Sequence, residues 1–434
     1  MPTILWFRRD LRLADHPALL AACAGGTDDV LPLFVVDPRL WGAAGTPRRA
    51  YLAASLRDLR ERLDGRLTLR TGDPVEVVPQ VAREVEATAV HVTADCGPYG
   101  AARDRAVEEA LGVPLVRTGS PYAVTPGRVL TQQGDPYRVF TPFLRSWAEH
   151  GWREPAGAPP DDQRWVGVAG EEIPAAEPPD GMRLPEAGED AAHRQWQRFL
   201  DEAVADYPAG RDRPDREGTS RMSVPLKWGE IHPRTLLADL ARLGAAEPGA
   251  AEAAGKVRAE LAWREFHADV LHHHPDAARR HLRRDWDAME YDAPGPAFDA
   301  WRRGETGFPI VDAGMRQLRE TGWMHNRVRM IAASFLVKDL HLDWRLGARH
   351  FLQWLVDGDL ASNQLNWQWV AGSGADAAPY FRVFNPTTQQ KKFDPGGEYV
   401  RRWVTDVDRP GYPEPVVDHA TERREALDRW EQIK

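Results

Sequence analysis

The chain begins with the run Thr3-Ile4-Leu5-Trp6-Phe7-Arg8-Arg9-Asp10-Leu11-Arg12, whose apolar half passes directly into a charged half. Four further short β-rich runs follow before residue 120, with amphipathic, helix-like stretches between them. The strand candidates are Thr3–Phe7, Val30–Val36, Leu67–Arg70, Ala89–Thr93 and Pro114–Val116, and the helix candidates include Ala50–Leu63 and Val75–Val85. Strands that alternate with helices predict an α/β domain built on a doubly wound parallel sheet.

The charged half of this run, Arg8 to Arg12, stands where a dinucleotide-binding fold needs its glycines. In such folds the pattern G-x-G-x-x-G directly after the first strand lets the backbone approach a pyrophosphate. The pattern does not follow this strand. The common cofactor-binding interpretation of a doubly wound domain therefore fails at its most specific point.

The length of 434 residues predicts two or three domains. Residues 161–210 contain twelve acidic and only four basic residues, most of the net charge of −9, and overlap a stretch rich in proline. That composition indicates a solvated connector. We expect an α/β domain over 1–130, a connector over 131–195 and a helical domain over 196–434. The acidic total argues against a protein that coats nucleic acid with its whole surface, but it allows a local basic groove.

The second half of the chain is rich in helical patterns and in tryptophan. Apolar faces predict helices over Val257–Leu271, Ile310–Glu320, Asn326–Leu340 and Arg345–Leu355, which make a larger all-α domain. The 17 Trp residues are an abnormally high number and indicate that the protein needs large π-faces.

Several function classes are disfavoured by what the sequence lacks. It has no HExxH, paired CxxC, GxSxG or P-loop motif. The consecutive His272, His273 and His274 would point in three directions on a helix, so we expect a polar helix end and no metal site. Only Cys23 and Cys96 are present, which fits a reducing cytoplasm, and the apolar runs are too short to span a bilayer. We expect a cytoplasmic monomer.

Three motifs in the helical half each allow a functional and a structural interpretation. The hydroxyls and N–H groups of Gly218–Ser223 suit a phosphate, although a plain helix N-cap is the better explanation of these residues alone. Glu260 and Trp263 share one helix face, either to hold a heteroaromatic ring or as a surface Glu beside a buried Trp. Asp357-Gly358-Asp359 could recognise a polar cofactor edge or terminate a helix. Together they predict an aromatic-lined cavity for a flat, anionic, heteroaromatic ligand.

Longer segments carry a resemblance to a known family, in order from residue 3 to about residue 418. They are Trp6–Arg12, Gly322–Met330, Asp357–Asn363, Trp367-Gln368-Trp369 and Phe384–Gln389. These segments resemble the photolyase/cryptochrome family, and among its members the class I photolyases that repair cyclobutane pyrimidine dimers.

The resemblance implies light-driven repair of UV-damaged DNA. In this family reduced FAD, bent into a U shape in the helical domain, is photoexcited and donates an electron to a cyclobutane pyrimidine dimer, which then splits. The cofactor supplies the difficult chemistry, and the protein positions and tunes it. The dimer must first be flipped out of the duplex, which costs less for a lesion that already pairs badly. The implied location is the cytoplasm, in association with the nucleoid.

The resemblance also assigns cofactor residues. The FAD phosphates are assigned to Tyr207, Thr219, Ser220, Arg221, Met222 and Ser223. The rest of FAD is assigned to Asn326, Arg329, Asp357, Gly358, Asp359 and Asn363. Within this set Arg329 is expected to pair with Asp357, and Asn363 to face flavin N5.

Contacts to DNA are assigned in the same way. Glu260 is the implied partner of the pyrimidine edge of the dimer, and Trp263 and Trp369 would flank the flipped lesion. Each stacked base is worth about 1–3 kcal/mol. The remaining implied contacts are Arg211, Arg264, Asn326, Arg327, Met330 and Gln389.

A chain of aromatic residues that reduces oxidised flavin is a further property of the family. Trp367 matches the inner position and Trp344 the middle one, but the outer position falls on Tyr291. Oxidation of tyrosine usually requires loss of the phenolic proton, so Trp286 or Trp301 is an alternative outer member.

The resemblance also implies an antenna chromophore. Lys227 and Asp95 match positions typical of members that use 8-hydroxy-5-deazaflavin. Members that use methenyltetrahydrofolate, the alternative, carry a different segment around residues 95–99. We expect deazaflavin in the cleft between the domains.

Two other functions compete with repair. A cryptochrome-like photoreceptor would bind FAD without repairing DNA, and Glu260, Trp263 and Asn363 argue against it. A dark flavin oxidoreductase is disfavoured because the nicotinamide-binding glycines are missing.

Overall fold

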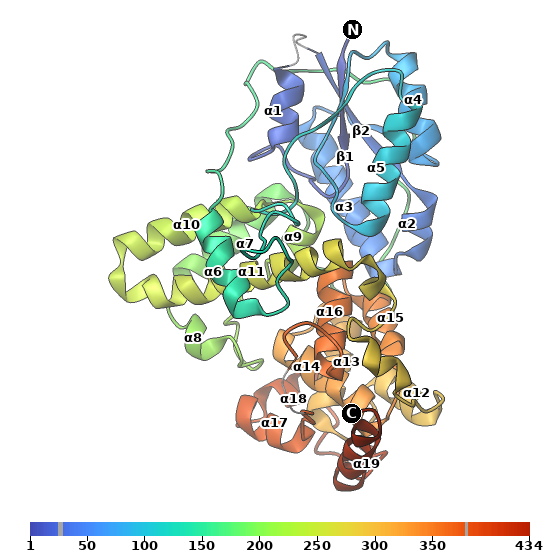
Figure 1. Cartoon of the computed structure of the whole chain (residues 1–434), viewed down its shortest axis with the longest axis vertical. Helices are drawn as coiled ribbons and strands as arrows, with labels where there is room; N and C mark the ends of the chain where they lie inside the picture. Colours follow the sequence, from blue (N-terminus) through green and yellow to red (C-terminus); the bar gives the residue numbers. More distant parts are fainter. Residues whose placement is uncertain (25–28, 378–380) are drawn as a thin grey trace.

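The computed structural model describes residues 1–24, 29–377 and 381–434. An α/β domain carries the N-terminus, and a larger helical domain contains the rest of the site-forming segments (Figure 1). No helix in this described part of the chain has the length and apolar character that crossing a membrane requires.

The α/β domain is built on a sheet whose strands all pair in parallel. Its main path runs β3-β2-β1-β4-β5, and β6 pairs with β2 off this path. The strands are β1 (Thr3–Phe7), β2 (Asp29–Val36), β3 (Thr68–Thr71), β4 (Val90–Val92), β5 (Leu115–Arg117) and β6 (Arg164–Trp165). The helices are α1 (Pro17–Cys23), α2 (Pro38–Ala43), α3 (Thr46–Arg62), α4 (Pro74–Glu84) and α5 (Pro98–Ala110). The prediction of a doubly wound parallel sheet is confirmed.

Side chains of β1 alternate between the two faces of the sheet, as the pleat requires. Leu5 and Phe7 enter one apolar cluster together with α1 and α3. Ile4 and Trp6 enter a second cluster together with α4 and α5. Both faces of the sheet are therefore covered by helices, which explains why its strands are apolar throughout.

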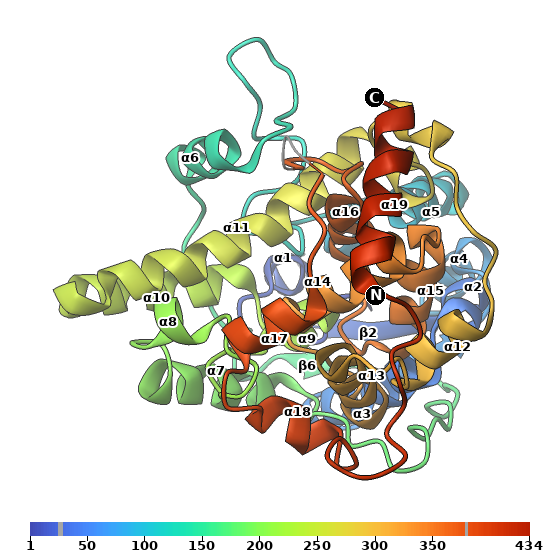
Figure 2. The same ribbon diagram turned by 90° about the horizontal axis from the view of Figure 1, so that it is seen from below.

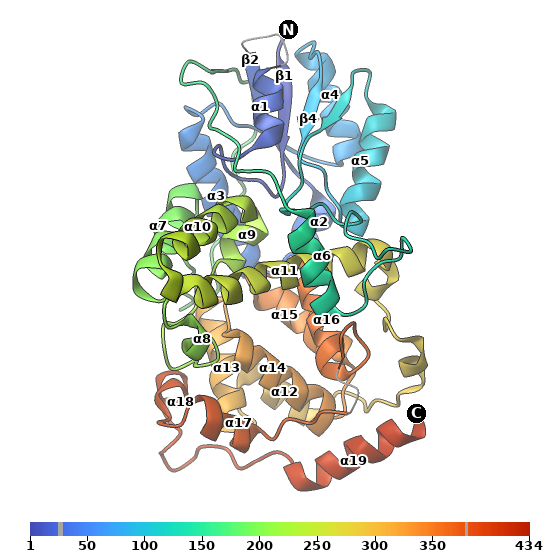
Figure 3. The same cartoon turned by 60° about the vertical axis from the view of Figure 1, so that its left-hand side comes forward.

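The expectation of a solvated connector over residues 131–195 is wrong in three places. This segment contains α6 (Phe140–His150), which packs beside α11 (Ala251–His273) with its aromatic face in the core (Figure 3). It also contributes β6 to the sheet. Its Glu189 is 4% exposed and accepts hydrogen bonds from two backbone N–H groups that follow β1. At least one acidic residue of this segment, Glu189, therefore stabilises the fold and is not solvated.

The helical domain consists of α6 to α19 and four short irregular turns. Its remaining helices are α7 (Glu189–Glu202), α8 (Tyr207–Gly210), α9 (Ser223–Trp228), α10 (Pro233–Ala246), α12 (Pro296–Arg303), α13 (Pro309–Thr321), α14 (Asn326–Ser334), α15 (Trp344–Trp354), α16 (Leu360–Ala371), α17 (Pro386–Phe393), α18 (Glu398–Trp403) and α19 (His419–Gln432). The turns are η1 (Pro248–Ala250), η2 (Pro275–Ala278), η3 (Arg284–Ala288) and the π-helical η4 (Phe335–Asp339). Figure 2 shows how α11 crosses this domain.

Helix α16 lies between two apolar cores. Its Ala361 and Leu365 belong to the core of α6, α10 and α11. Its Trp367 and Ala371 belong to the core of α13, α14 and α15. Polar residues on α16 are therefore placed at the boundary between the two cores, where a ligand can be enclosed.

The charged run after β1 joins the two domains. The amide of Leu11 donates to the carbonyl of Trp228 (3.2 Å), and Arg12 donates to the carbonyl of Gly229 (2.9 Å). Gly229 ends α9 with φ +71°, and a Cβ there would overlap the carbonyl of Arg9. The residues that replace a glycine-rich loop thus fasten the sheet to the helical domain.

Candidate functional site

A cavity lies between α14 and α16, with the end of α15 as its third wall. It is lined by Asn326, Arg329, Met330, Ala333, Phe351, Leu355, Asp357, Gly358, Asp359, Ser362, Asn363, Asn366, Trp367 and Val370. The structure therefore brings together the non-phosphate residues assigned to FAD, namely Asn326, Arg329, Asp357, Gly358, Asp359 and Asn363.

The acidic wall of the cavity is fixed by two arginines. Arg329 donates to both carboxylate oxygens of Asp357, at 3.2 and 2.8 Å. Asp359 caps the N-terminus of α16 by accepting from Ser362 (3.0 Å) and forms an ion pair with Arg9 (2.7 Å). Such two-point pairs of arginine with carboxylate set geometry as well as charge.

Electrostatics keep Asp359 ionised. Burial by itself would raise the pKa of Asp359, but the positive charges of Arg9, Lys227 and Arg264 outweigh it and hold the pKa well below its usual range. Asp359 is therefore a permanent negative charge at the point where α16, α9 and the loop after β1 meet.

Asn363 presents an acceptor to the cavity. Its Nδ2 donates to the carbonyl of Ala348 (3.1 Å) and to Oε1 of Gln364 (2.8 Å). These bonds fix the amide, and within the described ranges no donor is assigned to its Oδ1. A ring N–H that entered the cavity would find this oxygen oriented in advance.

The donor set fits a flavin. Met330, Phe351 and Leu355 give the cavity apolar walls, and Asn326 and Asn363 give it hydrogen-bonding edges. Binding sites for flat heteroaromatic groups combine mainly apolar walls with a few oriented polar groups in this way.

The residues assigned to the phosphates lie outside this cavity. Arg221 has φ +53°, a left-handed conformation that turns the segment 219–223 sharply. Ser223 accepts a hydrogen bond from Trp323 Nε1 (3.4 Å), and the guanidinium of Arg221 lies 4.7 Å from the centroid of the Trp323 ring.

 The same Trp323 ring lies 5.9 Å from the guanidinium of Arg329, so it links this segment to the cavity.

Tyr207 lies with the lesion residues instead. It is buried in α8, and the guanidinium of Arg211 lies 5.7 Å from its ring centroid. Burial and the charge of Glu260 raise the pKa of Tyr207 above its usual value, so its hydroxyl stays protonated.

Glu260 and Arg211 form an ion pair at the side of α11 that faces α8. Their closest oxygen and nitrogen atoms are 2.8 Å apart, and each side chain is about one-third exposed (34% and 28%). Burial raises the pKa of Glu260, although Arg211 opposes the shift. Arg327 is paired in the same way with Asp212 (2.8 Å). Two arginines assigned to DNA thus have acidic partners when DNA is absent.

The aromatic residues assigned to the lesion occupy different surroundings. Trp263 stacks on Phe140 of α6, with ring centroids 3.7 Å apart and planes 9° apart. Trp369 lines a separate cavity together with Trp286 and Phe384. Phe140 was missed because it falls in the segment expected to be solvated, and only its place in a helical apolar pattern could have signalled it.

Three other residues assigned to DNA lie in three different places. Met330 lines the cavity, and Gln389 lies partly exposed on α17. Arg264 does not lie with them, because its guanidinium donates to the carbonyls of Pro121 (3.0 Å) and Leu226 (3.2 Å). Arg264 thus links the loop at Pro121 to α9, and its contact with DNA stays a prediction.

The residues assigned to an antenna chromophore lie near the switch point of the sheet. β1 and β4 are neighbours whose connections run in opposite directions, and Arg9 and Asp95 follow their carboxyl ends. Ligands of open α/β sheets bind in this crevice. Burial, reinforced by Arg9, lowers the pKa of Lys227 to about 7. Charges of Arg9 and Arg103 outweigh burial and lower the pKa of Asp95.

The residues assigned to the aromatic chain lie in one apolar core and at its edge. Trp367 lines the cavity, and Trp344 is fully buried in the same core. Tyr291 is partly exposed and reaches Trp344 through His281, whose ring contacts both. Of the alternative members, Trp301 contacts Trp367 (6.3 Å between centroids) and Trp286 stacks on Phe381.

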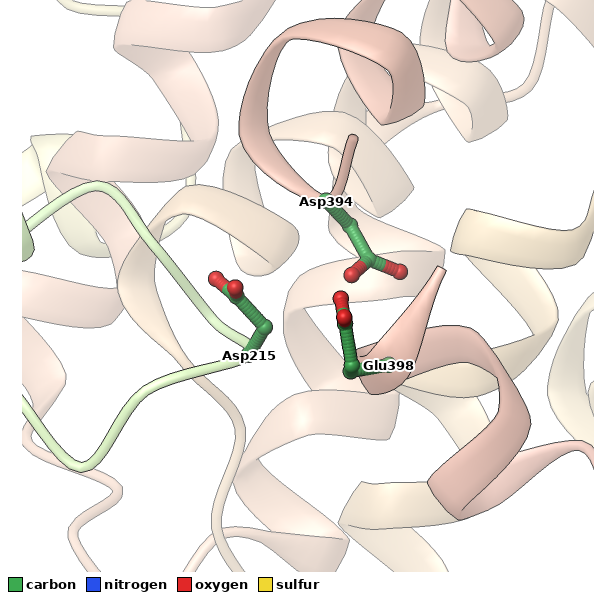
Figure 4. A group of neighbouring side chains, drawn as sticks. All are labelled: Asp215, Asp394 and Glu398. Carbon is green, nitrogen blue, oxygen red and sulfur yellow. The ribbon is translucent and has the colours of Figure 1, made fainter. Parts of the chain in front are cut away.

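A cluster of acidic residues lies apart from these sites. Carboxylate oxygens of Asp215, Asp394 and Glu398 approach one another within 4.8 Å (Figure 4). Asp215 forms an ion pair with Arg213 (2.5 Å), and Asp394 accepts from the backbone amides of Tyr399 and Val400 (3.0 Å each). The cluster caps α18 and is no basis for assigning a metal.

Two family models match the chain. One is described as DNA photolyase and covers residues 3–161, and the other as the FAD binding domain of DNA photolyase and covers residues 257–410. The deoxyribodipyrimidine photo-lyase of a Synechococcus strain is 38% identical over 100% of this chain and 97% of its own length. The chain belongs to the DNA photolyase family. The deoxyribodipyrimidine photo-lyase of Streptomyces griseus is 41% identical over 97% of each protein.

A solved structure of the photolyase family agrees in fold. A bacterial class III photolyase from Agrobacterium tumefaciens superposes with a TM-score of 0.90 at 37% identity, over 100% of this chain and 97% of that one. The family and the FAD-binding domain expected from the sequence are therefore confirmed. The roles of individual residues remain predictions.

Proposed function

We propose that this protein is a light-driven DNA repair enzyme that splits cyclobutane pyrimidine dimers. The observation that carries the proposal is the cavity between α14 and α16, which gathers Asn326, Arg329, Asp357 and Asn363. Membership of a family whose curated relatives are named deoxyribodipyrimidine photo-lyase supports it.

Residues of the cavity would hold the flavin and orient it. Arg329 and Asp357 neutralise each other and leave the wall without excess charge, while Asn363 Oδ1 accepts from a ring N–H. When bound, reduced FAD supplies the photoexcited electron for repair. The apolar side chains around it exclude water.

The lesion would be received by Glu260 and its neighbours. Glu260 is held by Arg211 in the absence of DNA, and a DNA phosphate can take over this arginine. The released carboxyl group, whose pKa burial raises, can then bond to the pyrimidine edge. Trp263, stiffened by its stack on Phe140, offers the lesion a flat apolar surface.

Two auxiliary functions complete the proposal. Trp367, Trp344 and Tyr291 would carry electrons inward from the surface to restore reduced flavin. The crevice at Arg9, Asp95 and Lys227 would hold an antenna chromophore, and the match of Lys227 and Asp95 to members that use 8-hydroxy-5-deazaflavin favours that dye over methenyltetrahydrofolate.

Repair of a dimer-containing oligonucleotide, measured under blue light and in darkness, tests the proposal. We expect repair only under light. Reversible photoreduction without repair would instead support a photoreceptor, and NAD(P)H turnover in darkness would support an oxidoreductase. An oligonucleotide without the lesion is the substrate control.

A further inference from the structure

His281 lies between the two outer members of the proposed aromatic chain. Its ring is 6.0 Å from that of Trp344 and 6.3 Å from that of Tyr291, between centroids. The Tyr291 hydroxyl is 3.4 Å from His281 Nε2, and His281 Nδ1 is 2.7 Å from Ser373 Oγ. A phenol, an imidazole and a buried hydroxyl thus form one line of hydrogen-bonding groups.

The position of Ser373 is fixed by its backbone. Its amide donates to the carbonyl of Gln368 (3.0 Å), and its carbonyl accepts from the amide of Arg283 (3.0 Å). Ser373 is 0% exposed. In the tautomer with the proton on Nδ1, His281 donates a hydrogen bond to the Ser373 hydroxyl, and the lone pair of Nε2 is directed to the Tyr291 hydroxyl.

Trp344 is poorly suited to keep a positive charge. Its Nε1 is buried and has no hydrogen-bond partner in the described part of the chain, so an oxidised indole has no neighbour to receive its proton. The guanidinium of Arg345 lies 5.1 Å from the Trp344 ring centroid. This positive charge disfavours a radical cation on Trp344 and favours its reduction by a neighbour.

We propose that His281 is the proton acceptor that allows Tyr291, in place of tryptophan, to serve as the terminal electron donor. The inference rests on the proposed electron path through Trp367 and Trp344. By accepting the phenolic proton, His281 allows a tyrosine to be oxidised at the outer position, where the family has tryptophan. Ser373 is the residue that positions His281.

The step balances as a coupled transfer of one electron and one proton. Tyr291 gives an electron to the Trp344 radical cation, which returns to neutral tryptophan, while the phenolic proton moves to His281 Nε2. The products are a neutral tyrosyl radical and a protonated imidazole. A thiolate from solution then donates one electron to the partly exposed Tyr291 radical and becomes a thiyl radical, while His281 returns the proton, so that neutral tyrosine and neutral imidazole are restored.

The surroundings of His281 keep its ring neutral, so that it can accept a proton. Burial, together with the charges of Arg345 and Arg284 and against those of Asp343 and Asp287, lowers the pKa of His281 to about 4. The ring is therefore neutral at neutral pH. Because protonated His281 is a much stronger acid than the phenol of Tyr291, whose pKa burial raises, it gives the proton back when the radical is reduced.

Flash photolysis of the protein loaded with oxidised flavin tests the inference. In the native chain we expect a tyrosyl radical, detected by electron paramagnetic resonance, whose formation slows in D₂O. His281→Phe should slow its formation about a hundredfold, the usual scale of a lost general base. His281→Gln, which restores an acceptor oxygen, should recover part of this rate, whereas a merely structural role predicts no recovery.

A second measurement does not depend on flavin. Nitrogen NMR of the ¹⁵N-histidine-labelled full chain should show His281 protonated at Nδ1 and unprotonated at Nε2. The opposite tautomer would overturn the inference.

Tyr291→Phe and Trp367→Phe separate this inference from the function on which it rests. Unchanged photoreduction in Trp367→Phe would overturn the proposed electron path itself. If Trp367→Phe abolishes photoreduction but the native chain forms no tyrosyl radical, the path stands and the role of His281 is wrong. Loss of the tyrosyl signal in Tyr291→Phe identifies its source, and Trp286→Phe, which should retain the signal, is the matched control.

Discussion

At the scale of single residues, charged groups in this protein are paired before any ligand arrives. Glu260 is held by Arg211 and Arg327 by Asp212. Arginines with solvent-accessible partners can exchange a carboxylate for a phosphate at little cost, because both are bound by the same fork of donors. Release of Glu260 would thus be linked to the binding of DNA.

Glu260→Ala should lower the yield of repaired dimers per photon by about a hundredfold, the lower end of what one preorganised polar group contributes to catalysis. The bound flavin should change little, because Glu260 does not line the cavity between α14 and α16. Repair yield and flavin absorbance, measured on the same preparation, check this. Glu252→Ala, at an exposed position in the same helix, is the matched control. An equal loss of flavin and repair would show that Glu260 is structural.

His350 should make stability depend on pH. Burial lowers the pKa of His350 to about 3, against a usual value of 6.5. As the pH falls below 6.5 the unfolded chain takes up this proton first, so the stabilising contribution of neutral His350 is lost progressively toward pH 3. The free energy of unfolding should therefore fall more steeply from pH 6.5 to 5 in the native chain than in His350→Asn, by up to about 1.4 kcal/mol per pH unit.

Urea unfolding at several pH values measures this difference. His150→Asn, at an exposed position, should give a curve parallel to that of the native chain. Parallel curves for His350→Asn as well would show that the buried imidazole does not titrate in this range.

Sequence patterns identify residues in contiguous motifs better than residues that act through tertiary contacts. The segments around Asn326 and Asp357 could be assigned by resemblance, and the structure places them together. His281 and Ser373 could not be found in this way, because they are 92 positions apart and only the fold brings them into contact. Phe140 was missed for a different reason, because it lies in a segment whose composition predicted a solvated connector.

At the scale of elements, α15 and α16 pack so closely that a glycine is required between them. A Cβ on Gly347 of α15 would overlap the ring of Trp367 on α16 and lie 2.7 Å from Leu336. Trp367 can therefore occupy its position only because residue 347 is a glycine.

Gly347→Ala should lower the free energy of unfolding by about 1–3 kcal/mol, the usual cost of overpacking. Displacement of Trp367 should also slow flavin photoreduction. Gly255→Ala in α11, where a Cβ would meet no atom within 4 Å, should instead raise stability by about 0.5–1 kcal/mol. Thermal melting of both variants checks the pair, and equal effects would contradict the close packing of α15 and α16.

Elements with a clear period are well predicted from the sequence, and elements with mixed signals are not. β1 has the predicted bounds, Thr3–Phe7, because its residues are apolar on both faces. The helix predicted over Asn326–Leu340 is α-helical only to Ser334 and continues as the π-helix η4. β6 and the burial of Glu189 could not be predicted, because the composition of a proline-rich acidic stretch does not show which of its residues pack against the neighbouring domain.

At the scale of the whole molecule, stability depends on the junction between the domains. Gly229→Ala should cost more than the roughly 1–2 kcal/mol of a left-handed residue, because the new Cβ would also overlap the carbonyl of Arg9. Gly181→Ala, with a similar φ of +76° and open space around it, should show the conformational cost alone. Thermal melting and protease susceptibility of the segment 151–187 measure both. An equal loss of stability in the two variants would mean that the contact between Gly229 and Arg9 does not contribute to the stability of the protein.

The Arg9–Asp359 ion pair spans this junction, and Asp359 also begins the helix that carries Asn363 and Trp367. Transfer of excitation between two dyes depends on the angle between their transition dipoles as well as on their separation. A dye bound next to Arg9 and a dye bound next to α16 would both be positioned by this ion pair, so their mutual orientation would be the same in every molecule. Light collected by the first would then reach the second with a uniform efficiency, because this salt bridge and the bonds of Leu11 and Arg12 to α9 and Gly229 hold the two domains in one orientation.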